Sequence, residues 1–175
     1  MPTDQNLLEE VYQFYDEYRT LLLNRKYYGK RLDQFKRYNL VMESAIAIGA
    51  AGSGAAGFAV WQTPAGTYAW ATISAISILL ASVKPFLRFA DRIENYGKLF
   101  GEYARACVSM KIVVARIQVN RTISEEDRKA LAQIQTRVAE LCGLEDSDPD
   151  LEFVRQLQSQ VIAEISIDQL WVPSP

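Results

Sequence analysis

The chain has 175 residues, with 19 Lys and Arg against 21 Asp and Glu, no histidine and two cysteines. A net charge of −2 and a mean hydropathy of −0.07 are, taken whole, those of an ordinary soluble domain. The absence of histidine excludes Ser-His-Asp catalysis, Cys-His catalysis and histidine metal ligands. Cys107 and Cys142 do not form a Cys-x-x-Cys pair, so we expect two buried thiols in a reducing compartment and no metal site.

The average conceals a stretch of 40 residues without any charge, residues 44–83. Two apolar segments, residues 40–61 and about 65–87, are separated by a turn at residues 62–66 that contains a proline and a glycine. At about 1.5 Å per residue the first segment spans roughly 33 Å, enough to cross the hydrocarbon core of a membrane. The sequence therefore predicts an all-α membrane protein with a two-helix transmembrane hairpin at residues 40–87. The alternative is a hairpin buried inside a soluble all-α protein, which the alanine- and glycine-rich first segment favours.

Basic residues flank the apolar hairpin on both sides, whereas the turn between its segments carries no charge. Six precede the first segment and three follow the second: Arg25, Lys26, Lys30, Arg31, Lys36 and Arg37, then Lys84, Arg88 and Arg92. Positively charged flanks remain on the cytoplasmic side of a membrane. We therefore expect a two-span protein of the cell inner membrane with both termini in the cytoplasm.

The glycines of the first apolar segment match the dinucleotide-binding pattern G-x-G-x-x-G at residues 52–57. That site also needs an acidic residue about 20 positions further on, and the next acid after Glu43 is Asp91. Small residues recurring at every fourth position instead favour close helix packing in lipid, either within the hairpin or between subunits. This helix-packing ladder consists of Ala45, Gly49, Ser53 and Gly57.

The regions on either side of the hairpin, residues 1–39 and 88–121, each carry a heptad pattern of apolar residues. The first runs through Leu7, Val11, Phe14, Tyr18, Leu21, Arg25, Tyr28, Leu32 and Phe35; the second runs through Phe89, Ile93, Tyr96, Phe100, Tyr103, Cys107, Met110, Val114 and Ile117. Because a hairpin brings Phe35 and Phe89 to the same membrane face, we expect two long cytoplasmic helices that pair antiparallel as a coiled-coil-like bundle. The aromatic residues are expected to form the core of this bundle.

Residues 122–175 form an acidic carboxyl-terminal module with four basic and eleven acidic residues, against eight basic and three acidic in residues 84–121. Ser124 and Asp150 are predicted helix N-caps, and Gly143 is a predicted C-cap. We expect this module to fold back on the basic region or to contact a partner. The basic region is expected to contact anionic lipid heads, and no nucleic-acid contact is expected.

Polar residues of the second apolar segment fall on one broad helical face and are candidates to line a pore: Thr67, Ser74, Ser77 and Ala81. Their hydroxyls can bind water in a lumen, or they can bond neighbouring helices and their own backbone. Glu43 and Lys84 lie at similar depth near the predicted inner boundary of the membrane. They form either a structural ion pair or an inner gate that opens on activation.

Two further motifs accompany the apolar segments: RKYYGKR at residues 25–31 and YGKLFGEY at residues 96–103. With this layout, nearly the whole chain resembles the SLATT domains, two-transmembrane effector domains of bacterial conflict systems. The resemblance implies an anti-phage membrane effector of the cell-suicide type that forms pores. It also implies a signalling partner, namely a nucleotidyltransferase, a nucleotide sensor or a reverse transcriptase system.

The residues show no arrangement of nucleophile, base and orienting group, so no enzyme, cofactor or metal is expected. The leading hypothesis is a membrane effector that homo-oligomerises in the lipid bilayer and permeabilises the bacterial inner membrane on a cytoplasmic signal. Two helices per subunit cannot enclose a water-filled path, so a pore requires an oligomer. One alternative is a membrane-anchored helical scaffold that recruits a cytoplasmic partner without conductance, and a weaker one is a soluble all-α binding protein.

Overall fold

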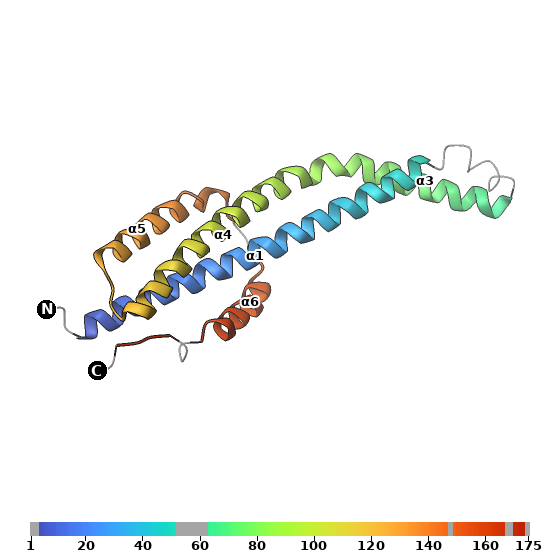
Figure 1. The fold of residues 1–175 in the computed structure, drawn as a ribbon. Coiled ribbons are helices and arrows are strands. Elements are labelled where there is room, and N and C mark those ends of the chain that lie inside the picture. The colour runs from blue at the N-terminus through green and yellow to red at the C-terminus, as the bar shows by residue number, and fades with distance from the viewer. Residues whose placement is uncertain (1–3, 52–62, 147–148, 167–169, 174–175) are drawn as a thin grey trace. The chain divides into compact units, whose positions relative to one another are not determined.

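The computed structural model describes residues 4–51, 63–146, 149–166 and 170–173 (Figure 1). Within these ranges it contains helices and no strand. The elements are α1 (Asp4–Ala51), α3 (Pro64–Leu87), α4 (Phe89–Asn120), α5 (Glu125–Ala139), a short 3-10 helix (Cys142–Leu144) and α6 (Leu151–Glu164). The predicted all-α fold class is confirmed for the described residues.

The chain divides into two compact units. The helical unit comprises Met1–Arg31 and Asn95–Pro175, and the hairpin unit comprises Leu32–Glu94. The unit boundaries lie inside α1 and α4, several residues outside the predicted hairpin of residues 40–87. Neither helix breaks there, because both heptad patterns continue across the boundary without a proline.

The core of the helical unit lies between α1 and α4, which run antiparallel (Figure 1). Tyr28 of α1 stacks on Tyr96 and Tyr103 of α4, with ring centroids 6.1 and 5.5 Å apart. Most of the predicted heptad positions in this unit are buried: Val11, Phe14, Leu21 and Tyr28 on α1, and Tyr96, Tyr103, Cys107, Met110, Val114 and Ile117 on α4. Tyr18 and Phe100 are half-buried, and Arg25 is exposed.

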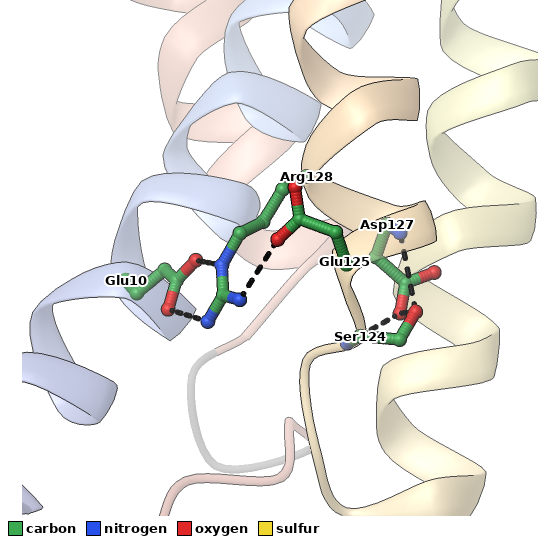
Figure 2. Close-up of polar contacts among 5 residues, drawn as sticks. All are labelled: Glu10, Ser124, Glu125, Asp127 and Arg128. Carbon is green, nitrogen blue, oxygen red and sulfur yellow. Dashed lines mark hydrogen bonds and ion pairs between the residues drawn. The ribbon is translucent and has the colours of Figure 1, made fainter. Parts of the chain in front are cut away.

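The acidic carboxyl-terminal module folds back on α1 and α4. Arg128 of α5 binds α1, with its Nη2 2.9 Å from Glu10 Oε2 (Figure 2). Arg137 of α5 binds α4, with its Nε 3.0 Å from Glu102 Oε2. On α6, Glu164 pairs with Lys26 of α1. The chain beyond α6 also contacts α1: the Tyr15 hydroxyl donates to the Trp171 carbonyl at 2.9 Å.

The acidic carboxyl-terminal module buries a second face of α1 and of α4 that the heptad patterns did not predict. On α1 the additional buried residues are Tyr15, Leu22 and Tyr27, and on α4 they are Leu99, Ala106 and Val113. Each long helix therefore packs on two sides, and a single heptad row accounts for only one of them.

The predicted caps of the module are correct at its two helix starts and wrong at the end of α5. Ser124 and Asp127 form a reciprocal capping box (Figure 2), and the Asp150 side chain accepts from the Phe153 N–H at 3.1 Å. Helix α5 ends at Ala139, and Gly143 lies in the 3-10 helix without a positive φ. After α5 the backbone forms tighter 3-10 turns, in which the Leu141 N–H donates to the Val138 carbonyl at 2.9 Å. In this conformation the Leu141 side chain is buried in the core. Cys142 is consequently exposed, so the prediction of two buried thiols holds only for Cys107.

In the hairpin unit, α3 begins earlier than predicted. Thr63 is its N-cap, accepting from the Gly66 N–H at 3.2 Å, and Pro64 occupies the first helical turn. Part of the predicted turn at residues 62–66 is therefore helical, because proline without an N–H suits the first position of a helix. Helix α3 ends at Leu87, Arg88 takes a left-handed conformation with φ 47°, and α4 begins at Phe89.

Candidate functional site: the apolar hairpin

Helix α3 exposes an apolar surface along its length. It has 24 residues, and only 6% of its most apolar window is buried. Tyr68 and Phe86 are 76% and 82% exposed, and the other large exposed side chains of α3 are Ile73, Ile76, Ile78, Leu79, Val83 and Leu87. Among the described residues, α3 is the one helix long and apolar enough to cross a membrane.

The first predicted span, residues 40–61, is described only as far as Ala51, the last residue of α1. The exposed side chains of this part of α1 include Leu40, Val41 and Ile48. The structure therefore supports α3 as one candidate span, and the span at residues 40–61 stays a prediction.

The helix-packing ladder contacts α3 in its described half. Gly49 is buried, and a Cβ atom added there would lie 1.8 Å from Ser77 Oγ and 2.3 Å from Ser77 Cβ. The Ser77 hydroxyl donates to the Ala45 carbonyl at 3.2 Å and to the Ile73 carbonyl at 2.9 Å. Ala45 and Gly49 thus let α1 and α3 of one chain approach closely. Ser53 and Gly57 lie outside the described residues.

The predicted pore-lining face is only partly free in the single chain. Ser77 is buried against α1 in the single chain, where its hydroxyl serves helix packing, one of the two roles expected for it; its place in a pore stays a prediction. The physical reason for the packing is that its hydroxyl is positioned to bond a carbonyl of the adjacent helix. Ser74 is half-buried, whereas Thr67 and Ala81 are exposed, and the Thr67 hydroxyl bonds the Thr63 carbonyl at 3.2 Å.

The predicted pair of Glu43 and Lys84 is present. Lys84 Nζ lies 2.8 Å from Glu43 Oε1, which also accepts from Asn39 Nδ2 at 3.2 Å. The pair borders a cleft of about 530 Å³ where α3 gives way to α4. Arg88 and Asp91, which pair with each other at 2.7 Å, complete the charged lining of this cleft. It therefore contains two cations and two carboxylates.

Aromatic side chains lie next to this charged cleft. The Phe35 ring contacts Tyr38 and Phe89, each with ring centroids 6.2 Å apart, and the guanidinium of Arg92 lies 5.3 Å from the Phe35 centroid. A band of aromatic and basic residues at the end of an apolar helix is typical of a membrane–water interface.

The sequence did not predict the role of Glu145 and Asp146. The structure brings their carboxylates to the tyrosines of the two sequence motifs, RKYYGKR and YGKLFGEY. The signal available in the sequence was an adjacent acidic pair between two helices, and nothing in its spacing identified tyrosine hydroxyls as its partners.

Comparison with known proteins found no matching family model, no matching curated protein and no matching solved structure.

Proposed function

We propose that this chain is a membrane effector of bacterial anti-phage defence, of the SLATT-like type. In this proposal, residues 40–61 and α3 cross the inner membrane as a hairpin, and the helical unit and both termini lie in the cytoplasm. The protein oligomerises and permeabilises the membrane when a cytoplasmic signal rearranges the helical unit.

The observation that carries the proposal is the exposure of α3. A core helix of a soluble protein has a similar composition but is mostly buried, whereas α3 is almost entirely uncovered. An exposed apolar surface of this length is costly in water and favourable in lipid. The basic residues around Lys84 and Arg88 support a cytoplasmic location for the adjoining helices.

Oligomerisation is required by the pore hypothesis because one hairpin cannot enclose water. The small residues at Ala45 and Gly49 already contact α3 of the same chain, so subunits would meet through other faces. Thr67, Ser74 and Ala81 remain the candidate lumen residues. Ser77 would join them only if α1 and α3 separated on activation.

Permeabilisation is tested by expressing the chain in bacteria with its genomic neighbours and measuring membrane potential after the system is triggered. Loss of potential, together with release of a dye from liposomes containing the purified chain, is the expected result. Intact potential and dye retention, despite confirmed insertion and triggering, would falsify the proposal. A neighbouring gene for a nucleotidyltransferase, a nucleotide sensor or a reverse transcriptase would identify the signalling partner.

The second candidate function is a membrane-anchored scaffold without conductance. It is favoured by the large helical unit, whose folding does not require a pore. Replacing residues 40–87 with an unrelated two-span anchor separates the two functions. A scaffold keeps its protective activity after this exchange, whereas a pore-forming effector loses it.

The ion pair between Glu43 and Lys84 is proposed as an inner gate. Lys84→Glu places two carboxylates together, and we expect leakage without a trigger because like charges separate the helices. Glu43→Lys combined with Lys84→Glu restores opposite charges and should restore the closed state. Lys36→Glu, a charge reversal at an exposed residue of the same unit, is the control. A purely structural pair would give no leakage in the single variant.

A further inference from the structure

Three tyrosine hydroxyls and one guanidinium of the helical unit converge on two adjacent carboxylates. The hydroxyls of Tyr27 and Tyr96 donate to Asp146, to Oδ2 at 2.9 Å and Oδ1 at 2.6 Å. The Tyr103 hydroxyl donates to Glu145, and Arg31 Nε lies 3.8 Å from Asp146 Oδ2. Both oxygens of Asp146 are thus held by donors from two different helices, α1 and α4.

The donors are fixed in place by aromatic packing. Tyr28 lies between them and stacks on both Tyr96 and Tyr103, while Tyr27 packs edge-on against Tyr28 with centroids 5.1 Å apart. Beside them, Gly29 leaves room for the Phe100 ring of α4, because an added Cβ would lie 3.1 Å from it. A set of hydroxyl donors held rigidly by their rings is a preorganised site for an anion.

The carboxylates belong to the segment between α5 and α6, and α6 is attached next to them. Tyr27 also contacts Phe153 of α6, with ring centroids 5.8 Å apart, and Lys30 Nζ lies 5.4 Å from the same ring. Only Leu157 and Val161 of α6 are fully buried. The carboxyl-terminal end of α6 is held separately, by the pair of Glu164 with Lys26 and by Arg19 Nε, which donates to the Ile165 carbonyl at 3.2 Å. The acidic pair therefore attaches the amino-terminal side of α6.

The cluster formed by these tyrosines, Arg31 and the acidic pair lies where the helical unit ends. Arg31 is the last residue of its first segment, and Tyr96 is the second residue after the chain re-enters it at Asn95. The acidic pair therefore bonds the last turns of both long helices before they continue into the hairpin unit.

We propose that Tyr27, Tyr96, Tyr103 and Arg31 form an anion-binding site that the chain occupies with its own Glu145 and Asp146, as a latch. Release of this acidic pair loosens the amino-terminal side of α6 from α1 and is the step that activates the hairpin. The consequence for the hairpin rests on the proposed effector function, whereas the latch itself does not.

The test uses the full chain in lipid nanodiscs and measures amide hydrogen exchange by mass spectrometry. In Glu145→Gln with Asp146→Asn, the shape is kept and the charge is lost, so we expect exchange in α6 to rise about tenfold or more. Exchange in the core of α4 should stay at the wild-type level. The matched control is Glu9→Gln with Glu140→Gln, which removes two exposed acids outside the cluster and should leave α6 unchanged.

A second variant, Tyr27→Phe with Tyr96→Phe and Tyr103→Phe, keeps the stacked rings and removes only the hydroxyls. It should raise exchange in α6 in the same way. Unchanged exchange in α6 would overturn the latch, because the acids would then be dispensable. Equal loss of protection in α4 would also overturn it, because the acids would then stabilise the whole helical unit and not α6 in particular. Raised exchange in α6 without any change in membrane permeability supports the latch and contradicts its role as the activating step, whereas the effector function itself is overturned by the membrane-potential and dye-release experiment.

Discussion

At the scale of single residues, Gly49 has less space for a side chain than Gly29, Gly97, Gly101 or Gly143. Ser77 of α3 occupies the space that a side chain at position 49 would need, and its atoms would lie well below van der Waals distance from an added Cβ. Gly97 and Gly101 of α4 have open space around the corresponding position. The sequence pattern grouped small residues by spacing, but only the position of Ser77 shows which of them carries a close contact.

Gly49→Ala should weaken the packing of α1 on α3 by about 1–3 kcal/mol, because overpacking forces the helices apart. Adding Ser77→Gly removes the clashing Cβ and should recover most of this loss. Thermal unfolding of the hairpin in detergent measures both effects. In the control, Gly97→Ala should be neutral or stabilise α4 by about 0.5–1 kcal/mol. Equal destabilisation by Gly49→Ala and Gly97→Ala would contradict this account.

The buried tyrosines make the stability of the helical unit sensitive to alkali. Burial, followed by the hydrogen bond to Asp146, raises the pKa of Tyr27 to about 12, and burial with the nearby Glu145 also raises the pKa of Tyr103 and Tyr28. Because these folded-state pKa values exceed the unfolded value of about 10, the stabilisation is complete below pH 10. It is lost as the pH rises from about 10 towards 12 for Tyr27.

We therefore expect the melting temperature to fall steeply above about pH 10, in parallel with tyrosinate absorbance. Tyr27→Phe removes one titrating hydroxyl and should make this fall shallower, although the variant starts from a lower stability at neutral pH. Melting curves recorded across this pH range test the prediction. Wild type and variant with the same alkaline slope would show that Tyr27 does not contribute.

At the scale of elements, helix α5 is positioned by its first turn. Ser124 and Asp127 exchange hydrogen bonds, with the Ser124 N–H donating to Asp127 Oδ2 at 3.0 Å and the Asp127 N–H donating to Ser124 Oγ at 3.2 Å. Asp127 is only 1% exposed, and its Oδ1 lies 3.3 Å from Arg116 Nη1 of α4. One carboxylate thus caps α5 and attaches it to α4.

Ser124→Ala should cost about 1 kcal/mol, the usual value of an N-cap. Asp127→Ala should cost more, because it also removes the buried partner of Arg116 and leaves the Ser124 N–H without its acceptor. Thr136→Ala, at an exposed position of the same helix, should change stability little. Denaturant unfolding of the three variants gives the ranking, and equal costs for Ser124→Ala and Asp127→Ala would contradict the dual role.

The expected helix at residues 88–121 agrees closely in extent with α4, Phe89–Asn120, whereas the expected helix at residues 1–39 continues in α1 as far as Ala51. The heptad rows also identified most of the α1–α4 core. They missed Tyr15, Tyr27 and Leu99, because a helix that is contacted on two sides has two buried rows and a single heptad row describes only one of them. The acidic module was identified by its charge, but the choice between a fold-back and an external partner needed coordinates.

At the scale of the whole molecule, the chain divides into the helical unit and the hairpin unit. The buried rows of the helical unit draw on residues before Arg31 and after Asn95, together with α5 and α6. Such a unit has its own hydrophobic core and is expected to fold without the hairpin.

Replacing residues 40–87 with a short flexible loop should therefore leave a soluble, helical protein with a cooperative thermal transition. The intact chain should stay in the membrane pellet after an alkaline carbonate wash, whereas the shortened chain should be released. Circular dichroism and membrane fractionation measure the two outcomes. A shortened chain without a cooperative transition would show that the hairpin is part of one common core.

The sequence by itself determined the helical class, the long apolar segments, the position of the charges and the single heptad rows. These features depend on composition and on periodicity within one element, which are local properties of the chain. Only the tertiary structure decided that Ser77 packs against Gly49, that Gly143 does not cap α5, and that Glu145 and Asp146 bind the tyrosines of both motifs. These outcomes depend on which faces meet in space, and contacts between residues far apart in the chain follow from the packing of whole helices.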